Sequence, residues 1–227
     1  MSATAGVQRA MVLAAGRGER LRPLTDSVPK PLITVRGKPL IIHHLEKLAH
    51  IGVREVVINL SWLGGKIREA LGDGSHWKVR IHYSDEGDVA LETGGGIERA
   101  LPQLGPGPFL VVNADVFTEF DFAQLSIAPH ALAQLLLVPN PPHHPHGDFA
   151  LMGQLVTEST QRDWTYAGIG LFRAELFAGC APGRFPLLPL LQRAISLRRL
   201  HGQVYRGLWS DVGSAERLNA LQEMAAR

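Results

Sequence analysis

The chain has 227 residues and a mass of 24.7 kDa, enough for one large domain with a complete core, and we expect residues 1–227 to form a single domain. Its formal net charge of +2 is mild and its basic residues gather near the N-terminus, which favours a small anionic ligand over nucleic acid. No apolar run approaches the ~20 residues that cross a bilayer, so we expect no membrane partner. A single cysteine, Cys180, excludes an internal disulfide and fits a reducing, cytoplasmic compartment. The sequence leaves protein partners unknown.

Short apolar runs alternate with segments of helical period along the whole chain. In chain order, we expect strands over 10–15, 53–60, 79–84, 109–112 and 131–138, then antiparallel strands over 151–157 and 165–172, and a last strand over 204–209. Helices are expected over 39–50, 66–71, 97–101 and 186–197, with a closing helix from about Ala215 capped by Ser214. This order predicts an α/β fold with a Rossmann-like, mixed but mostly parallel sheet and helices on both faces.

A glycine-rich basic loop follows the first predicted strand. Gly16 and Gly18 lack the Cβ atoms that would keep a ligand away from the backbone N–H groups, and prolines stiffen the segment. Four cations lie within fifteen residues, opposed only by Glu19 and Asp26, so they repel one another unless an anion binds. They are Arg17, Arg20, Arg22 and Lys30. The loop therefore predicts a phosphate-binding site.

Two common phosphate loops do not fit this segment. A P-loop ends in Gly-Lys-Ser/Thr, whereas Gly18 is followed by Glu19 and Arg20. The dinucleotide fingerprint requires a third glycine where this chain has Leu21, and the next strand ends without an acidic residue for a ribose.

Two carboxylates follow apolar strands further along the chain. Asp115 comes after the strand over 109–112, and Asp211 after the strand over 204–209. Ligands of open α/β sheets bind beyond the carboxyl ends of the strands. Each aspartate alone is more often a turn residue, but the pair together with the phosphate loop predicts a Mg²⁺ site, because Mg²⁺ takes one or two carboxylates plus phosphate oxygens.

These motifs resemble those of the sugar-1-phosphate nucleotidyltransferases. The family signature, Leu-Ala-Ala/Gly-Gly-x-Gly-x-Arg-Leu-x-Pro-x-Thr followed by Pro-Lys-Pro, is matched from Leu13 to Pro31. The resemblance implies that the loop binds a nucleoside triphosphate, that Arg20 binds the leaving pyrophosphate and that Lys30 reaches the reacting phosphates. Both would be catalytic, and Asp115 and Asp211 would hold the metal. The nucleotide-binding residues so implied are Ala14, Gly16, Gly18, Glu19, Arg20, Lys30, Thr93 and Gly94.

Further candidates lie in the middle of the chain. Residues 92–96 read Glu-Thr-Gly-Gly-Gly, which the resemblance places over the nucleotide as a loop before the helix at 97. It also implies Glu92, Asn113 and Asp148 as substrate-binding residues, with Asp148 bonding sugar hydroxyls. The adjacent loop contains three histidines and several prolines, which we interpret as a rigid rim of a sugar pocket and not as a zinc site.

One departure from the family pattern bears on the sugar. The stretch between Asp148 and Tyr166 contains no lysine where many members have Glu-Lys-Pro, and Arg162 is the nearest alternative cation. This points to a compact subgroup whose pocket has room for a lactyl ether.

From this resemblance we expect a uridylyl transfer from UTP to a sugar 1-phosphate, specifically N-acetylmuramate 1-phosphate, which would belong to peptidoglycan sugar recycling. Three alternatives remain open at this point. They are a mannose-1-phosphate guanylyltransferase, a glucose-1-phosphate uridylyl- or thymidylyltransferase, and an inactive regulatory subunit that binds nucleotide sugars.

Overall fold

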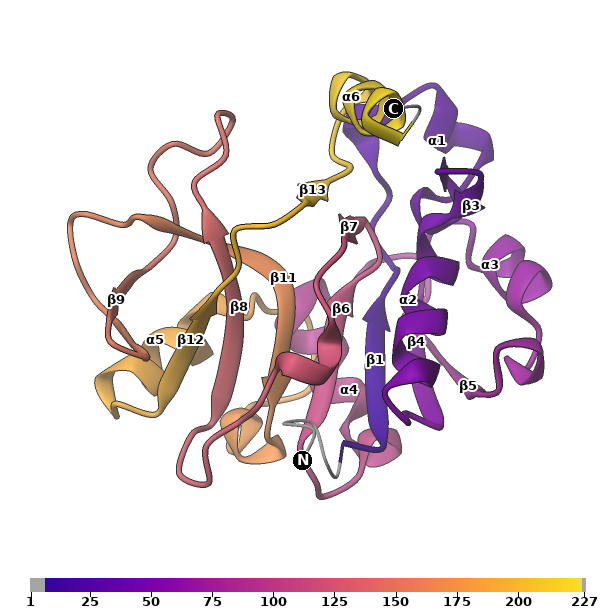
Figure 1. Cartoon of the computed structure of the whole chain (residues 1–227). Helices are drawn as coiled ribbons and strands as arrows, with labels where there is room; N and C mark the ends of the chain where they lie inside the picture. The colour runs from indigo at the N-terminus through magenta and orange to yellow at the C-terminus, as the bar shows by residue number, and fades with distance from the viewer. Residues whose placement is uncertain (1–6, 226–227) are drawn as a thin grey trace.

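A computed structural model describes residues 7–225 and is built around one nine-stranded sheet (Figure 1). The strand order is β5-β4-β1-β6-β11-β8-β12-β10-β9. Seven strands run in one direction, and β11 and β10 oppose them. In chain order these strands are β1 (Arg9–Leu13), β4 (Glu55–Leu60), β5 (Arg80–Asp85), β6 (Phe109–Asn113), β8 (Ala133–Pro139), β9 (Ala150–Met152), β10 (Leu155–Thr157), β11 (Trp164–Phe172) and β12 (Leu200–Val204).

Helices and short ladders complete the fold. The α-helices are α1 (Leu24–Ser27), α2 (Leu40–His50), α3 (Gly64–Leu71), α4 (Glu92–Leu104), α5 (Leu188–Ser196) and α6 (Ala215–Ala225). The two-stranded ladders pair β2 (Thr34–Val35) with β3 (Lys38–Pro39), and β7 (Val116–Thr118) with β13 (Trp209–Asp211). Short 3₁₀ helices are η1 (Glu19–Leu21), η2 (Lys30–Leu32), η3 (Ser75–Trp77), η4 (Phe122–Gln124) and η5 (Ala174–Phe177).

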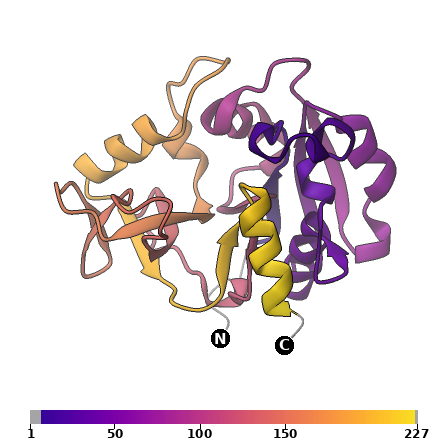
Figure 2. The same cartoon turned by 90° about the horizontal axis from the view of Figure 1, so that it is seen from above.

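The sheet buries side chains on both faces, as alternation along its strands requires. Ala10 and Val12 of β1 pack in a cluster with α2 and α3, whereas Met11 packs on the other face with α4 and α5. The view from above shows helices on both sides of the sheet (Figure 2). A third cluster joins Leu218 and Leu221 of α6 to the β2–β3 ladder and to Phe117 of β7. The predicted α/β fold with a mixed, mostly parallel sheet is confirmed.

Most predicted elements are confirmed within a few residues, and two boundaries follow from identifiable local causes. Gly52, at φ +92°, stands just past the end of α2, where a left-handed residue closes the last turn. The Oγ of Ser214 accepts the N–H of Arg217 over 3.3 Å, so the predicted cap of α6 is present.

Three predictions of elements were wrong in detail. The segment 151–157 is a hairpin, β9 and β10, that turns at Gly153 (φ +64°). No strand runs over 204–209. Instead, β12 begins at Leu200 and pairs in parallel with β8, and β13 begins at Trp209. We missed β12 because it contains His201, Gly202 and Gln203 in place of an apolar run.

The third wrong boundary is that of α4, which begins at Glu92 and not at Ile97. The three glycines are therefore helical and buried. A Cβ at Gly95 would lie 2.0 Å from the carbonyl oxygen of Gly183, and one at Gly96 would lie 2.6 Å from Glu86 Oε1. The glycines allow neighbouring segments to approach the helix closely. In the sequence, a run of three glycines is more typical of a loop, so the helix was predicted to begin too late.

No helix within residues 7–225 is both long enough and apolar enough to cross a membrane.

One buried histidine makes the stability of this fold depend on pH. His44 of α2 is 1% exposed and stacks on Phe122, and no hydrogen-bond partner for either ring nitrogen is found among the described residues. Burial lowers the pKa of His44 to about 4. In the unfolded chain it should titrate near its usual value of about 6.5.

We therefore expect the free energy of unfolding to decrease as pH falls from about 6.5 to 4, because only the unfolded chain binds a proton at His44 in that range. The loss reaches about 3 kcal/mol at most. Urea unfolding at pH 7.5 and pH 5, compared between wild type and His44→Leu, measures it. The variant should show a shallower dependence on pH, whereas His76→Leu, at an exposed site, should not. Equal slopes in all three proteins would contradict the assignment.

Candidate active site

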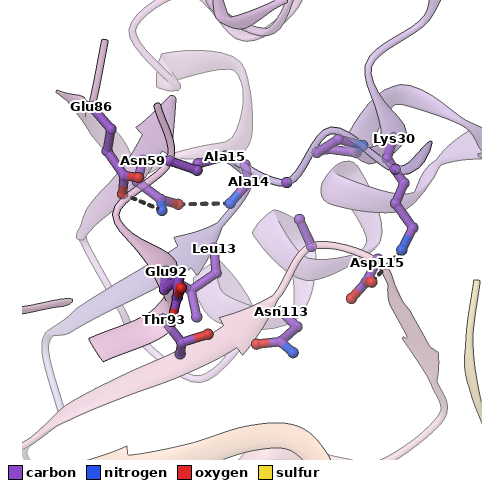
Figure 3. A pocket seen from close by; sticks show the side chains of 15 residues that line it. Leu13, Ala14, Ala15, Lys30, Asn59, Glu86, Glu92, Thr93, Asn113 and Asp115 are labelled. Carbon is purple, nitrogen blue, oxygen red and sulfur yellow. Dashed lines mark hydrogen bonds and ion pairs between the residues drawn. The ribbon is translucent and has the colours of Figure 1, made fainter. Parts of the chain in front are cut away.

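A pocket of about 230 Å³ opens where β1, β4 and β6 end (Figure 3). These three strands are parallel and in register, so Asn59, Leu13 and Asn113 form a row across their ends. We refer to this cavity as the first pocket. It is lined by Leu13, Ala14, Ala15, Gly16, Gly18, Lys30, Pro31, Asn59, Glu86, Ala90, Glu92, Thr93, Asn113, Ala114 and Asp115.

The glycine-rich loop forms one wall of the first pocket and is fixed by its own hydrogen bonds. Gly18 has a φ of +69°, and its carbonyl accepts both the Leu21 N–H over 2.9 Å and the Thr25 hydroxyl over 2.9 Å. Trp62 donates its indole N–H to the Thr25 carbonyl over 2.9 Å. Such a loop presents its N–H groups in one arrangement before any ligand arrives.

The four cations of this loop have different surroundings. Arg22 pairs with Asp26 at an exposed position, and Arg17 lies over the Trp62 ring. Lys30 and Arg20 instead line cavities. The structure thus separates two cations that face solvent from two that face potential ligands.

Lys30 forms a direct ion pair with Asp115. The lysine side chain is 11% exposed and the carboxylate 33%, so the pair is largely withdrawn from solvent. Figure 3 shows the Lys30 nitrogen beside Asp115, with Glu92 and Thr93 on the opposite side of the pocket. Lys30 comes from η2 and Asp115 follows β6, so the contact joins two segments far apart in the sequence.

Asn59 and Glu86 complete the floor of the first pocket, and the sequence analysis missed both. Asn59 accepts the Ala14 N–H over 2.7 Å and donates to Glu86 over 2.7 Å. The second oxygen of Glu86 accepts the Leu91 N–H over 2.7 Å. The available signal was their position: Asn59 lies one residue before the end of β4 and Glu86 directly follows β5.

A second pocket of about 320 Å³ adjoins the first, and Asn113 and Asp115 line both. Its far wall is the bulged part of β11, where pairing with β8 shifts between Tyr166 and Gly170. Gly168 has a φ of +73°, and a Cβ there would lie 2.7 Å from Asn113 Nδ2. The second pocket is lined by Arg20, Asn113, Asp115, Val116, His143, His144, Thr165, Tyr166, Ala167, Gly168, Trp209 and Asp211.

The β7–β13 ladder brings the two predicted metal ligands to this pocket. Asp211 pairs with Val116, and the Val212 N–H donates to the Asp115 carbonyl over 2.8 Å. The carboxylate of Asp211 lies 3.2 Å from His143 Nε2 and 3.3 Å from an Arg217 nitrogen. Burial lowers the pKa of His143, and the nearby Asp211 opposes this effect.

The donor set at this edge suits a hard divalent cation. Both groups are carboxylates. Asp211 Oδ1 is buried, and among the described residues its 3.2 Å contact with His143 Nε2 lacks hydrogen-bond geometry. Residues 7–225 contain no group of three His, Cys, Asp or Glu side chains that could hold a metal alone. Two protein oxygens beside a phosphate pocket match the preference of Mg²⁺ for few carboxylates plus phosphate oxygens and water.

Three predicted residues lie elsewhere. Gly94 is buried under Phe185 and lines neither pocket, and Glu19 is exposed on η1. Asp148 also lines neither pocket: its carboxylate accepts the Tyr166 N–H over 2.8 Å and lies 2.9 Å from His144 Nε2. Asp148 instead lines a separate groove together with Arg162, Glu158 and Leu188.

Comparisons with known proteins agree with this geometry. Residues 9–154 match the family model of nucleotidyl transferases. The chain is 48% identical to the N-acetylmuramate alpha-1-phosphate uridylyltransferase of Neisseria meningitidis serogroup B over 96% of this chain and 98% of that protein. It is 35% identical to the enzyme of the same name from Caulobacter vibrioides, over 91% of this chain and 92% of that one.

The fold also matches a solved structure. A protein of Bacillus anthracis, assigned as a glucose-1-phosphate thymidylyltransferase, superposes with a TM-score of 0.84 at 20% identity, covering 96% of this chain and 94% of that chain.

Proposed function

Because the chain belongs to the nucleotidyl transferase family, we propose that it transfers a uridylyl group from UTP to a sugar 1-phosphate and releases pyrophosphate. One observation carries the proposal: two pockets meet at Asp115, beside Lys30. Two substrates bound side by side would bring their phosphates together there. We place the nucleotide in the first pocket and the sugar phosphate in the second, within one catalytic domain spanning residues 1–227.

The reaction is an in-line displacement. An oxygen of the sugar phosphate forms a bond to the α-phosphorus of UTP, and the bond between that phosphorus and the bridging oxygen breaks as pyrophosphate leaves. The attacking oxygen is already ionised, so the enzyme needs no general base. Catalysis then consists of positioning and charge neutralisation, to which Lys30 and Arg20 contribute.

The remaining residues have positional roles in this scheme. The N–H groups of residues 15–18 are placed to surround the triphosphate, while Glu92 and Thr93 line the part of the first pocket opposite Lys30. Asn113 lies between the two pockets and is placed to contact the sugar phosphate.

Asp115 and Asp211 would hold Mg²⁺, which when bound neutralises phosphate charge at the junction. Lys30 forms an ion pair with Asp115. Its ammonium group therefore lies beside the carboxylate that the phosphates would approach.

The sugar of the proposal is N-acetylmuramate 1-phosphate, supported by the two relatives of that name. The reaction would serve peptidoglycan sugar recycling in the cytoplasm. We expect a panel of four nucleoside triphosphates and several sugar 1-phosphates to give the highest kcat/KM with UTP and this sugar. A pyrophosphate-release assay measures it. Equal or better efficiency with glucose or mannose 1-phosphate would reject the sugar, and absence of release with every pair would favour a regulatory subunit.

Lys30→Ala should lower kcat by roughly 100-fold or more, because it removes a preorganised charge from the reacting phosphates. Arg20→Ala should have a smaller effect of the same kind. Lys38→Ala and Arg22→Ala provide matched controls, since their side chains form exposed ion pairs with Glu46 and Asp26. A change in KM alone at Lys30 would identify a binding residue and contradict its role in the transition state.

Asp115→Ala and Asp211→Ala should each weaken divalent-cation binding and lower turnover by roughly 100-fold or more. Both serve one ion, so the double variant should be little worse than either single variant. Binding of Mn²⁺ to the protein with UTP, followed by electron paramagnetic resonance, tests the site independently of activity. Asp163→Asn, at an exposed position, is the control. Unchanged Mn²⁺ affinity in both single variants would overturn the metal assignment.

A further inference from the structure

We propose that His144, held by Asp148, binds a carboxylate carried by the sugar and thereby selects an acidic sugar 1-phosphate. The inference rests on the proposed function, because it places the sugar in the second pocket. It assigns to His144 a binding role, and to Asp148 the role of a positioning residue that acts through His144.

Asp148 is already engaged through both carboxylate oxygens. One accepts the backbone N–H of Tyr166 over 2.8 Å, and the other lies 2.9 Å from His144 Nε2. A carboxylate only accepts hydrogen bonds, so Nε2–H is the donor in the second contact. Asp148 therefore fixes the orientation of the imidazole and commits one ring nitrogen. A carboxylate at the other nitrogen needs a second N–H, so the proposed contact uses the imidazolium form of His144, whose Nδ1–H donates to the sugar carboxylate.

The loop that carries His144 is itself held in place. Asn140 donates to the carbonyls of Arg162 over 2.7 Å and of Pro145 over 3.2 Å. Gly147 has a φ of +57°, and a Cβ there would lie 2.4 Å from Asn140 Oδ1. The ring is thus positioned in advance, which lowers the entropic cost of binding a ligand.

The charges of the second pocket point to His144 for an anion. Asp115 and Asp211 also line this pocket and would repel a carboxylate placed beside them, so an anion is expected to bind one of the cationic side chains. Three side chains lining this pocket can carry positive charge. Arg20 is assigned to phosphate, and His143 faces Asp211 at 3.2 Å. His144 faces Asp148, which pairs with it and with the Tyr166 N–H.

Two other polar residues that line this pocket, Tyr166 and Thr165, are uncharged. Burial raises the pKa of Tyr166, so its phenol stays uncharged at neutral pH. The Thr165 hydroxyl donates to Asn140 over 3.0 Å. These groups can bond sugar hydroxyls, but they do not distinguish an acidic sugar from a neutral one by charge.

Arg162 is the other cation of this region that could meet a sugar carboxylate, and its position argues against that role. Its side chain is exposed and lines a groove that it shares with Asp148 and not the second pocket. Its backbone carbonyl accepts a hydrogen bond from Asn140. Through this backbone carbonyl, Arg162 helps to hold the loop that carries His144.

The test compares two sugars that differ only in the lactyl ether, N-acetylmuramate 1-phosphate and N-acetylglucosamine 1-phosphate. Selectivity is the ratio of their kcat/KM values with UTP. In His144→Gln we expect this ratio to fall roughly tenfold to hundredfold, the scale of a hydrogen bond to a charged group. The change should appear in KM for the muramate substrate, because the lactyl group is remote from the reacting phosphate.

Asp148→Asn should lower the ratio less than His144→Gln, and the double variant should resemble His144→Gln because the two residues act as a unit. His146→Gln is the matched control: it changes the same residue type in the same loop, at an exposed position lining neither pocket. Thermal unfolding of each variant checks that the fold is retained.

The possible outcomes separate this inference from the proposed function. A wild-type preference for the muramate substrate that persists in His144→Gln overturns the inference and leaves the proposed function standing. A ratio that falls equally in His146→Gln also overturns it, since the effect would then belong to the loop in general. No preference in the wild type rejects the proposed sugar together with the inference, and a selective fall at His144 and Asp148 supports both.

Discussion

The ion pair between Lys30 and Asp115 connects the two segments that form the site, the glycine-rich loop and the chain that follows β6. Burying a lysine carries a large cost in desolvation unless a partner compensates the charge, and Asp115 is that partner. Through it, the end of the glycine-rich loop is attached to the chain that follows β6. The same contact lies at the junction of the two pockets. The Lys30–Asp115 pair therefore stands where the phosphates of the two substrates would meet.

Strand register determines what surrounds this ion pair. β1 pairs in parallel with β4 and β6, which places Leu13 beside both Asn59 and Asn113. A slip of one residue would turn each asparagine to the opposite face of the sheet. The hydrogen bond from Ala14 to Asn59 then connects the start of the glycine-rich loop to β4, and Glu86 extends the connection to the segment before α4. The floor of the first pocket is therefore a direct consequence of the sheet.

Sequence reasoning reached the fold class and most elements, because these depend on short-range patterns, and the same patterns predicted the site residues at strand ends. Short continuous apolar runs predicted β1 and β6, and the loop motif predicted Lys30 and Arg20 as site residues. It failed where tertiary contacts decided the outcome. The three glycines of α4 looked like a loop in the sequence. Glycine is required there because Gly183 and Glu86, which are distant in the chain, pack closely against the helix. Asn59 and Glu86 were missed because an amide and a carboxylate at strand ends have no local signature. Asp148 was assigned to sugar hydroxyls, and only the fold shows that its carboxylate contacts His144 and the Tyr166 N–H.

Different parts of the sheet form the two pockets, so nucleotide binding and sugar binding would depend on different elements. The first pocket is built by the parallel strands β1, β4 and β6 and by the start of α4, whereas the second takes its far wall from β11 and the loop after β8. These two sets of elements share the junction at Asn113 and Asp115. Substitutions in the loop after β8 can therefore change which sugar is accepted while the glycine-rich loop keeps its hydrogen bonds. In the proposed reaction, chemistry common to all sugar phosphates belongs to the junction, and the choice among sugars belongs to β11 and the loop after β8, more than 100 residues from Lys30 in sequence.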